Sequence, residues 1–222
     1  MSKKVLAIHQ PDFLPYSGFF YKLAKADYFL IGDYYSYSDS GYIQRVKLGG
    51  EWLTEMVVDK KKLTLDTPIS KVYVDAEVTY QRILSAIDKH LKDAPHYKRV
   101  KKMIRKWGDE YGFGVTSLSF LNMSLIEAVC DELGIEVRGK MNLLMYDKPK
   151  DLHKGELIVE IMKRSYPEAA YLSGAGGKGY IGTEFEDAGI ELLYSSHKAK
   201  YSDSILAVIA YEDNPLSIVL AD

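Results

Sequence analysis

The chain has 222 residues, of which 47% are hydrophobic and 27% are charged, and its formal net charge is −2. This balance argues against a globally basic nucleic-acid-binding protein. The single cysteine, Cys130, excludes a disulfide framework and a four-cysteine zinc site. The chain has 18 tyrosines, whose rings combine apolar area with a hydroxyl group and therefore suit polar binding clefts.

The start of the chain does not have the pattern of a secretory signal. Lys3 and Lys4 precede only about four apolar residues, too few for the core of a signal peptide. No apolar run in the sequence approaches the length that crosses a bilayer. We therefore expect a cytoplasmic protein with no membrane partner.

The N-terminal segment predicts a strand, a turn, a helix and a second strand. Residues 5–8 and 28–31 are short apolar runs, typical of buried strands. Pro11 and Pro15 disfavour helix in the turn between them, and apolar residues at helical spacing follow Ser17. Such a βαβ unit normally has parallel strands and a right-handed crossover.

The middle of the chain predicts a hairpin followed by helices. Two runs, 42–48 and 51–58, flank Gly49-Gly50, which is typical of a β-hairpin, and residues 71–74 are a further strand candidate. Apolar residues at helical spacing predict three amphipathic helices: 80–91, 96–107 and 117–133. Gly134 is expected to end the third of these helices.

Strands and helices alternate again in the last third of the chain. The predicted elements are strand 135–137, helix 152–162, strand 169–172 and strand 190–194; residues 204–211 and 216–220 fit either helix or strand. This alternation predicts an α/β fold, with a Rossmann-like, mainly parallel sheet. We expect a single domain over residues 1–222, with a hairpin insertion at about 42–74 and a helical insertion at about 80–133.

The turn 9–18 is the first candidate site. In open α/β sheets, ligands bind where strand C-termini meet helix N-termini, which attract phosphate or carboxylate groups. A histidine such as His9 can serve as an acid or base near neutral pH, and Asp12 can orient it. Gln10 can form hydrogen bonds to an amide or hydroxyl group of a ligand. The alternative is that the two prolines and Gly18 only shape a turn, with His9 as a structural residue.

The loop 173–179 is the second candidate. Its glycines, including Gly174, Gly176 and Gly177, allow close backbone approach, and Lys178 adds a positive charge. Such a loop after a strand can form an anion-binding nest, although it does not match the P-loop pattern. Ser173 can donate a hydrogen bond to a ligand oxygen. The alternative is an ordinary surface loop.

The segment 89–106 carries eight Lys or Arg residues and one acid, Asp93. Such a face can bind nucleic acid, although a charge run on an amphipathic helix is more often only its solvated side. The five histidines are scattered and predict no metal site. Cys130 lies on an apolar helix face and is expected to fill the core.

Several segments spread over nearly the whole chain also match those of one protein family, in the same order. They are 8–20, 26–27 with Asp33, Arg45 with 52–54, 94–97, 118–134, 171–174 with Tyr180, and 216–218. In these segments the sequence resembles the WbqC-like proteins. The resemblance implies a product of a bacterial surface-polysaccharide (O-antigen) cluster, where transfer of an amino-acyl group, such as glycyl, or an acyl group to an amino sugar has been proposed.

Our main hypothesis is therefore a transferase that joins an amino-acyl or acyl group to an amine of a nucleotide-linked sugar or a related phosphorylated acceptor. His9 is the expected base and is helped by Asp12, and Gln10 stabilises the oxyanion with the loop amides. The remaining expected binding residues are Tyr16, Gly18, Asp33, Arg45, Ser173, Gly174, Gly176, Gly177, Lys178 and Tyr180.

Two alternatives remain open. One is a phage enzyme that modifies nucleotides or DNA by amino-acid transfer, with the basic segment 89–106 holding the nucleic acid. The other is a non-catalytic module that binds a nucleotide or nucleic acid for a partner enzyme. The sequence names neither a cofactor nor an oligomeric state.

Overall fold

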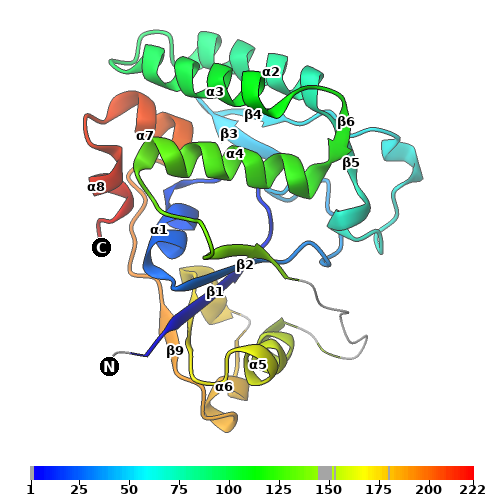
Figure 1. Ribbon diagram of the computed structural model, residues 1–222, viewed down its shortest axis with the longest axis vertical. Helices are drawn as coiled ribbons and strands as arrows, with labels where there is room; N and C mark the ends of the chain where they lie inside the picture. The colour runs from blue at the N-terminus through cyan, green and yellow to red at the C-terminus, as the bar shows by residue number, and fades with distance from the viewer. Residues whose placement is uncertain (1–2, 145–151, 153, 180) are drawn as a thin grey trace.

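The computed structural model describes residues 3–144, 152, 154–179 and 181–222. Its centre is a five-stranded, fully parallel sheet (Figure 1). The strand order is β7-β2-β1-β8-β9. The strands are β1 (Val5–His9), β2 (Tyr28–Ile31), β7 (Met141–Leu143), β8 (Ala170–Ser173) and β9 (Leu192–Tyr194). The predicted Rossmann-like, mainly parallel α/β fold is confirmed.

The direction in which strands are added reverses beside β1. From β1 the chain adds β2 and then β7 on one side, and it later adds β8 and β9 on the other side. Leu6 of β1 pairs with Tyr28 of β2 and with Tyr171 of β8. The carboxyl ends of β1 and β8 therefore lie side by side at a topological switch point, the place where open α/β sheets bind ligands.

Helices cover both faces of the sheet (Figure 1). On one face lie α1 (Ser17–Lys25), α4 (Leu118–Leu133), α7 (Ile205–Tyr211) and α8 (Pro215–Val219); on the other lie α5 (Lys154–Ser165) and α6 (Glu184–Asp187). Side chains alternate between the faces: Ala7 belongs to the larger core and Ile8 to the smaller one. The buried strands therefore read as continuous apolar runs.

The segment between β2 and α4 contains a hairpin, a second two-stranded sheet and two helices. Strands β3 (Arg45–Leu48) and β4 (Glu51–Thr54) form the predicted hairpin, and both turn glycines have positive φ, +60° at Gly49 and +81° at Gly50. Strand β5 (Tyr73–Asp75) pairs with β6 (Val115–Ser117), a strand that the sequence did not predict. Between them lie α2 (Ala76–His90) and α3 (Tyr97–Tyr111).

The strand predicted at 135–137 is wrong. Gly134 ends α4 in the left-handed conformation as predicted, but the amide of Ile135 then donates to the Cys130 carbonyl and caps the helix. The chain joins the sheet only at Met141, beside Phe29 of β2. In the C-terminal part, both ambiguous segments are helical.

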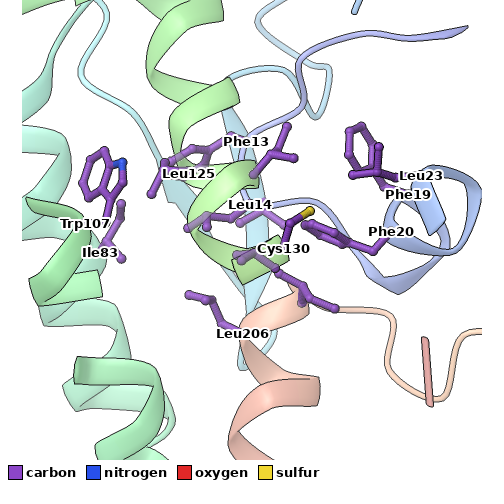
Figure 2. Close-up of a cluster of buried hydrophobic side chains, with 14 of the residues drawn as sticks. Phe13, Leu14, Phe19, Phe20, Leu23, Ile83, Trp107, Leu125, Cys130 and Leu206 are labelled. Atoms are coloured by element: carbon purple, nitrogen blue, oxygen red, sulfur yellow. The ribbon is translucent and has the colours of Figure 1, made fainter. Parts of the chain in front are cut away.

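The large core is continuous from the sheet to the helical insertion. Figure 2 shows part of it, with side chains from the turn after β1 and from α1, α2, α3, α4 and α7. Cys130 is fully buried there, and desolvation raises the pKa of its thiol. It fills the core, as predicted.

Candidate functional site

Hydrogen bonds from the C-terminal segment, from α4 and to the segment before β3 hold the turn between β1 and α1. The Leu14 carbonyl accepts a hydrogen bond from Ser204 Oγ at 2.8 Å, and the Pro15 carbonyl accepts one from the Ile205 amide at 2.9 Å. Leu14 itself is fully buried with a φ of +41°, an uncommon conformation for a non-glycine residue. Because such strain persists only where the surroundings enforce it, the C-terminal segment fixes the shape of this turn.

Asn122 of α4 is the second anchor of the turn. Its side-chain nitrogen donates to the Pro11 carbonyl at 2.8 Å and to the Ile43 carbonyl at 2.7 Å, and the residue is fully buried. The amide of Phe13 also donates to the Tyr42 carbonyl at 3.0 Å. One side chain thus ties the start of the hairpin segment to the turn.

His9 and Asp12 lie together at the carboxyl end of β1. His9 Nδ1 lies 3.1 Å from the Gln10 carbonyl and 3.7 Å from Asp12 Oδ2. Since a carbonyl oxygen only accepts, Nδ1 carries the proton in neutral His9, and Nε2 keeps its lone pair. Nε2 has no hydrogen-bond partner in the described part of the chain. The base and orienting group that the sequence predicts are therefore neighbours.

Lys22 of α1 completes this cluster, and the sequence reasoning missed it. Its ammonium group lies 3.4 Å from the Ile8 carbonyl, and the residue is 6% exposed. Its Cδ lies 4.0 Å from the position that a Cβ on Gly174 would take. Lys22 therefore spans from the end of β1 to the loop after β8. The available signal was its position as the only charged residue in the otherwise uncharged stretch 17–24.

Burial moves the pKa values of all three groups. Desolvation and, to a smaller extent, the nearby Lys22 charge together lower the pKa of His9 to about 3. Desolvation raises the pKa of Asp12 to about 7, although Lys22 opposes this. Desolvation lowers the pKa of Lys22 to about 8, although Asp12 opposes this. Asp12 and Lys22 therefore both titrate close to neutral pH, with Asp12 the more acidic of the two, whereas His9 is uncharged there.

The loop after β8 lies at the same edge but is more regular than a free glycine loop. Residues Ala175–Gly179 form a 3₁₀ helix, in which the Gly177 amide donates to the Gly174 carbonyl. No glycine of this loop has positive φ, so the alternating backbone of an anion nest is not formed. A Cβ on Gly177 would lie 1.9 Å from Ser173 Oγ, so a side chain at this position would force the Ser173 hydroxyl to turn away.

The other predicted residues surround the cluster at different depths. Asp33 follows β2, next to β1, and desolvation raises the pKa of its carboxyl group. Tyr16 lies over Gly18, where a Cβ would come within 2.5 Å of the tyrosine ring. The Lys178 ammonium lies 5.2 Å from the centre of the Tyr194 ring, at the end of β9. Arg45 lies further out, on the hairpin. Tyr180 lies outside the described residues.

Comparison with known proteins agrees with the family resemblance seen in the sequence. The model of the WbqC-like protein family matches residues 10–207. The chain belongs to the WbqC-like protein family. It is also 25% identical over 182 residues to the uncharacterized protein Rv1507c of Mycobacterium tuberculosis (strain ATCC 25618 / H37Rv), covering 80% of this chain and 75% of that protein. No solved structure matches the chain.

Membership in the WbqC-like family is consistent with a biosynthetic enzyme, and neither match names a reaction. Within the described ranges, no helix is both long and apolar enough to cross a membrane. The same residues contain no cluster of three or more His, Cys, Asp or Glu side chains that would hold a metal ion.

The basic segment 89–106 of this WbqC-like chain lies away from the cluster. Helix α3, which carries most of it, packs on α2, α4 and α7, on the far side of α4 from the sheet (Figure 1). Four of its eight cations have carboxylate partners: Lys89 with Glu51, Arg99 with Glu132, Lys101 with Asp88, and Lys106 with Glu110. Nucleic-acid binding through this face stays a prediction.

Glu55 lies just after β4 and is a buried carboxyl group like Asp12. It was not among the residues singled out from the sequence. It is 2% exposed, and desolvation raises its pKa well above the usual value, although the nearby Asn122 amide opposes this. Neither of its oxygens has a partner at ordinary hydrogen-bond distance in the described structure. Burial therefore favours the uncharged form of Glu55, which lies next to the amide that anchors the turn.

We expect Glu55→Gln to stabilise the protein above neutral pH. A raised folded-state pKa gives stability that is complete below the unfolded value, about 4.3, and is lost as pH rises toward the folded value. Glutamine cannot ionise, so the variant should show a flatter dependence of the unfolding free energy on pH. Urea unfolding between pH 4 and 9 measures this, with exposed Glu168→Gln as the control. Equal pH dependence in Glu55→Gln and the parent would contradict it.

Proposed function

We propose that this WbqC-like protein transfers an amino-acyl or acyl group to an amine of a nucleotide-linked sugar or a related phosphorylated acceptor. The observation that carries the proposal is the cluster of partly exposed His9 with buried Asp12 and Lys22 at the switch point between β1 and β8. Burying ionisable groups costs stability, and perturbed pKa values gather at functional sites. A purely structural turn does not need this arrangement.

The pKa values favour Asp12 over His9 as the base for the reaction. The amine nitrogen attacks the carbonyl carbon of the donor, the new C–N bond forms, and the leaving group departs with the electron pair of its bond. The amine proton goes to Asp12, whose pKa of about 7 suits that task at neutral pH. His9 Nε2 accepts a hydrogen bond from the amine and orients its lone pair.

Lys22 supplies the positive charge of the proposed site. As an ammonium group with a pKa of about 8, it is mostly charged at neutral pH. From its place between Ile8 and Gly174 it can stabilise the oxyanion that develops on the donor carbonyl, together with Gln10 and Ser173. The acceptor phosphates then lie toward Arg45 on the hairpin.

Ligand binding and transfer test the proposal in sequence. Nucleotide sugars with a free amine, nucleotides and amino acids are first screened for a rise in melting temperature, which binding to the native state produces. The ligands that bind are then combined with activated amino-acyl or acyl donors, and mass spectrometry looks for the amide product. Binding without amide formation from any donor would leave only a binding module.

We expect His9→Ala to lower the transfer rate about 10²-fold, because the amine loses its orienting acceptor. The melting temperature should change little, since the ring is partly exposed and packs edge-on against one side chain, Phe19. His96→Ala, which removes a surface contact to Asp213, is the matched control. An unchanged rate in His9→Ala would remove His9 from the site.

A further inference from the structure

Three partly exposed aromatic side chains gather beside the cluster, and we call them the aromatic shelf: Tyr16, Tyr42 and Trp52. Their exposed fractions are 46%, 57% and 44%. The rings of Tyr42 and Trp52 lie 5.9 Å apart between centroids. Tyr16 ends the turn that carries Asp12, and in that turn the Phe13 amide donates to the Tyr42 carbonyl at 3.0 Å. The shelf thus leads outward from the proposed reaction centre.

Two cations of β3 lie over the shelf. The Arg45 guanidinium stacks on the Trp52 ring at 4.1 Å from its centre, and its Nη2 donates to the Ser40 carbonyl at 2.7 Å. The Lys47 ammonium lies 5.5 Å from the centre of the same ring. Among the described residues no carboxylate lies within 4.0 Å of either cation, whereas the nearby Lys89 is paired with Glu51 at 2.6 Å. Arg45 and Lys47 therefore leave a local excess of positive charge.

The backbone makes the shelf rigid. Lys47 pairs directly with Trp52 across the hairpin, and Arg45 lies two residues before Lys47, so all three side chains share one face. The Lys47 carbonyl accepts a hydrogen bond from the Ser204 amide at 2.9 Å, and Ser204 also holds the turn after β1. Buried Asn122 fixes the other end of the hairpin segment. A ligand on the shelf would meet side chains already in place.

Trp52 also borders a groove beside the shelf. It lines this groove, of about 320 Å³ between β4 and α2, together with Arg82 and His90, whereas the other shelf residues do not line it. The hairpin packs against α2 through β4. A volume of this size admits a small planar ring with its attached sugar.

We infer that the aromatic shelf binds the nucleoside diphosphate part of the acceptor. The base stacks on Trp52 and Tyr42, the phosphates lie against Arg45 and Lys47, and the amine-bearing sugar reaches past Tyr16 to Asp12. Stacking on aromatic side chains holds any base, and guanidinium groups bind phosphate oxygens in a fixed geometry. The inference rests on the proposed function for the role of this ligand, but it makes a binding claim that is independent of turnover.

Calorimetric titration of the whole protein with UDP, ADP and inorganic pyrophosphate tests this inference. Trp52→Ala should weaken UDP and ADP binding about 10-fold or more and leave pyrophosphate binding unchanged, because only the first two carry a base. Arg45→Gln and Lys47→Gln should weaken all three ligands. Trp52→Tyr keeps an aromatic ring and should therefore retain most of the parent protein's affinity for UDP and ADP. The controls are Phe113→Ala, another exposed aromatic residue, and Lys102→Gln on α3.

Three results would overturn the shelf: no nucleotide binding by the parent protein, unchanged affinity in Trp52→Ala, or equal losses in the two control variants. Tighter binding of a short DNA or RNA oligonucleotide than of ADP, lost on Lys102→Gln, would replace the nucleotide with a nucleic-acid strand on α3. Trp52-dependent UDP binding without any amide product supports the shelf and removes the transferase. Amide formation with an unchanged KM in Trp52→Ala keeps the transferase and removes the shelf.

Discussion

In the Asp12→Asn variant we expect transfer to slow by about 10²–10⁴-fold, the range for loss of a positioned base. Asparagine keeps the shape of the side chain but cannot accept the amine proton. The measurement is the rate of amide formation at saturating acceptor, with exposed Asp66→Asn as the control. A rate within threefold of the parent would exclude Asp12 as the base.

The pH dependence makes this prediction sharper. Transfer needs Asp12 deprotonated, so the rate should rise with pH through about 7, and it needs Lys22 protonated, so the rate should fall above about 8. The parent profile is then a narrow bell whose two limbs belong to the pair. The residual activity of Asp12→Asn should lack the acid limb and keep the alkaline fall. An acid limb unchanged in Asp12→Asn would assign it to another group.

A stability measurement separates this loss of function from misfolding. The double variant Asp12→Asn, Lys22→Met removes both buried charges, and we expect it to be inactive but at least as stable as the parent. Burying charged groups costs stability, and functional sites often trade stability for activity. A large drop in its melting temperature would indicate that the pair serves the fold instead.

Asn122→Ala should destabilise the protein by about 2–5 kcal/mol. The substitution leaves two buried carbonyl groups, those of Pro11 and Ile43, without their donor, and each unpaired group costs about 1–3 kcal/mol. Urea unfolding measures the effect, with exposed Asn142→Ala on the edge strand β7 as the control. Equal unfolding midpoints for the two variants would contradict the anchoring role.

The same variant links the fold to the site. Asn122 fixes the turn that carries Asp12 and the segment that carries Tyr42, so its loss should also lower the rate at temperatures where the variant is folded. A displacement of about 1 Å at a reacting group can cost 10²-fold in rate. Unchanged kinetics in a destabilised Asn122→Ala would show that the turn keeps its shape without this anchor.

Local patterns carried much of the fold. Three kinds of element depend only on neighbours a few residues away, which a sequence displays directly. They are the apolar strands β1 and β2, the Gly49-Gly50 turn, and helix α4 with its terminal Gly134. The wrong strand prediction at 135–137 has a long-range cause. The apolar residues there have the pattern of a strand, but Ile135 caps α4, and the chain first reaches the edge of β2 at Met141. Strand β6 escaped prediction because its partner lies about forty residues earlier.

For the proposed site, the sequence by itself determined that His9, Asp12 and the prolines share one turn after a strand, because these residues lie within a few positions of one another in the chain. Only the tertiary structure decided that Lys22 and Asn122 belong to it. A lysine and an asparagine within apolar helices become site residues when distant segments enclose them, and enclosure is also what moves the pKa values of Asp12 and Lys22. Desolvation depends on everything that surrounds a group in space, which the order of residues along the chain does not state.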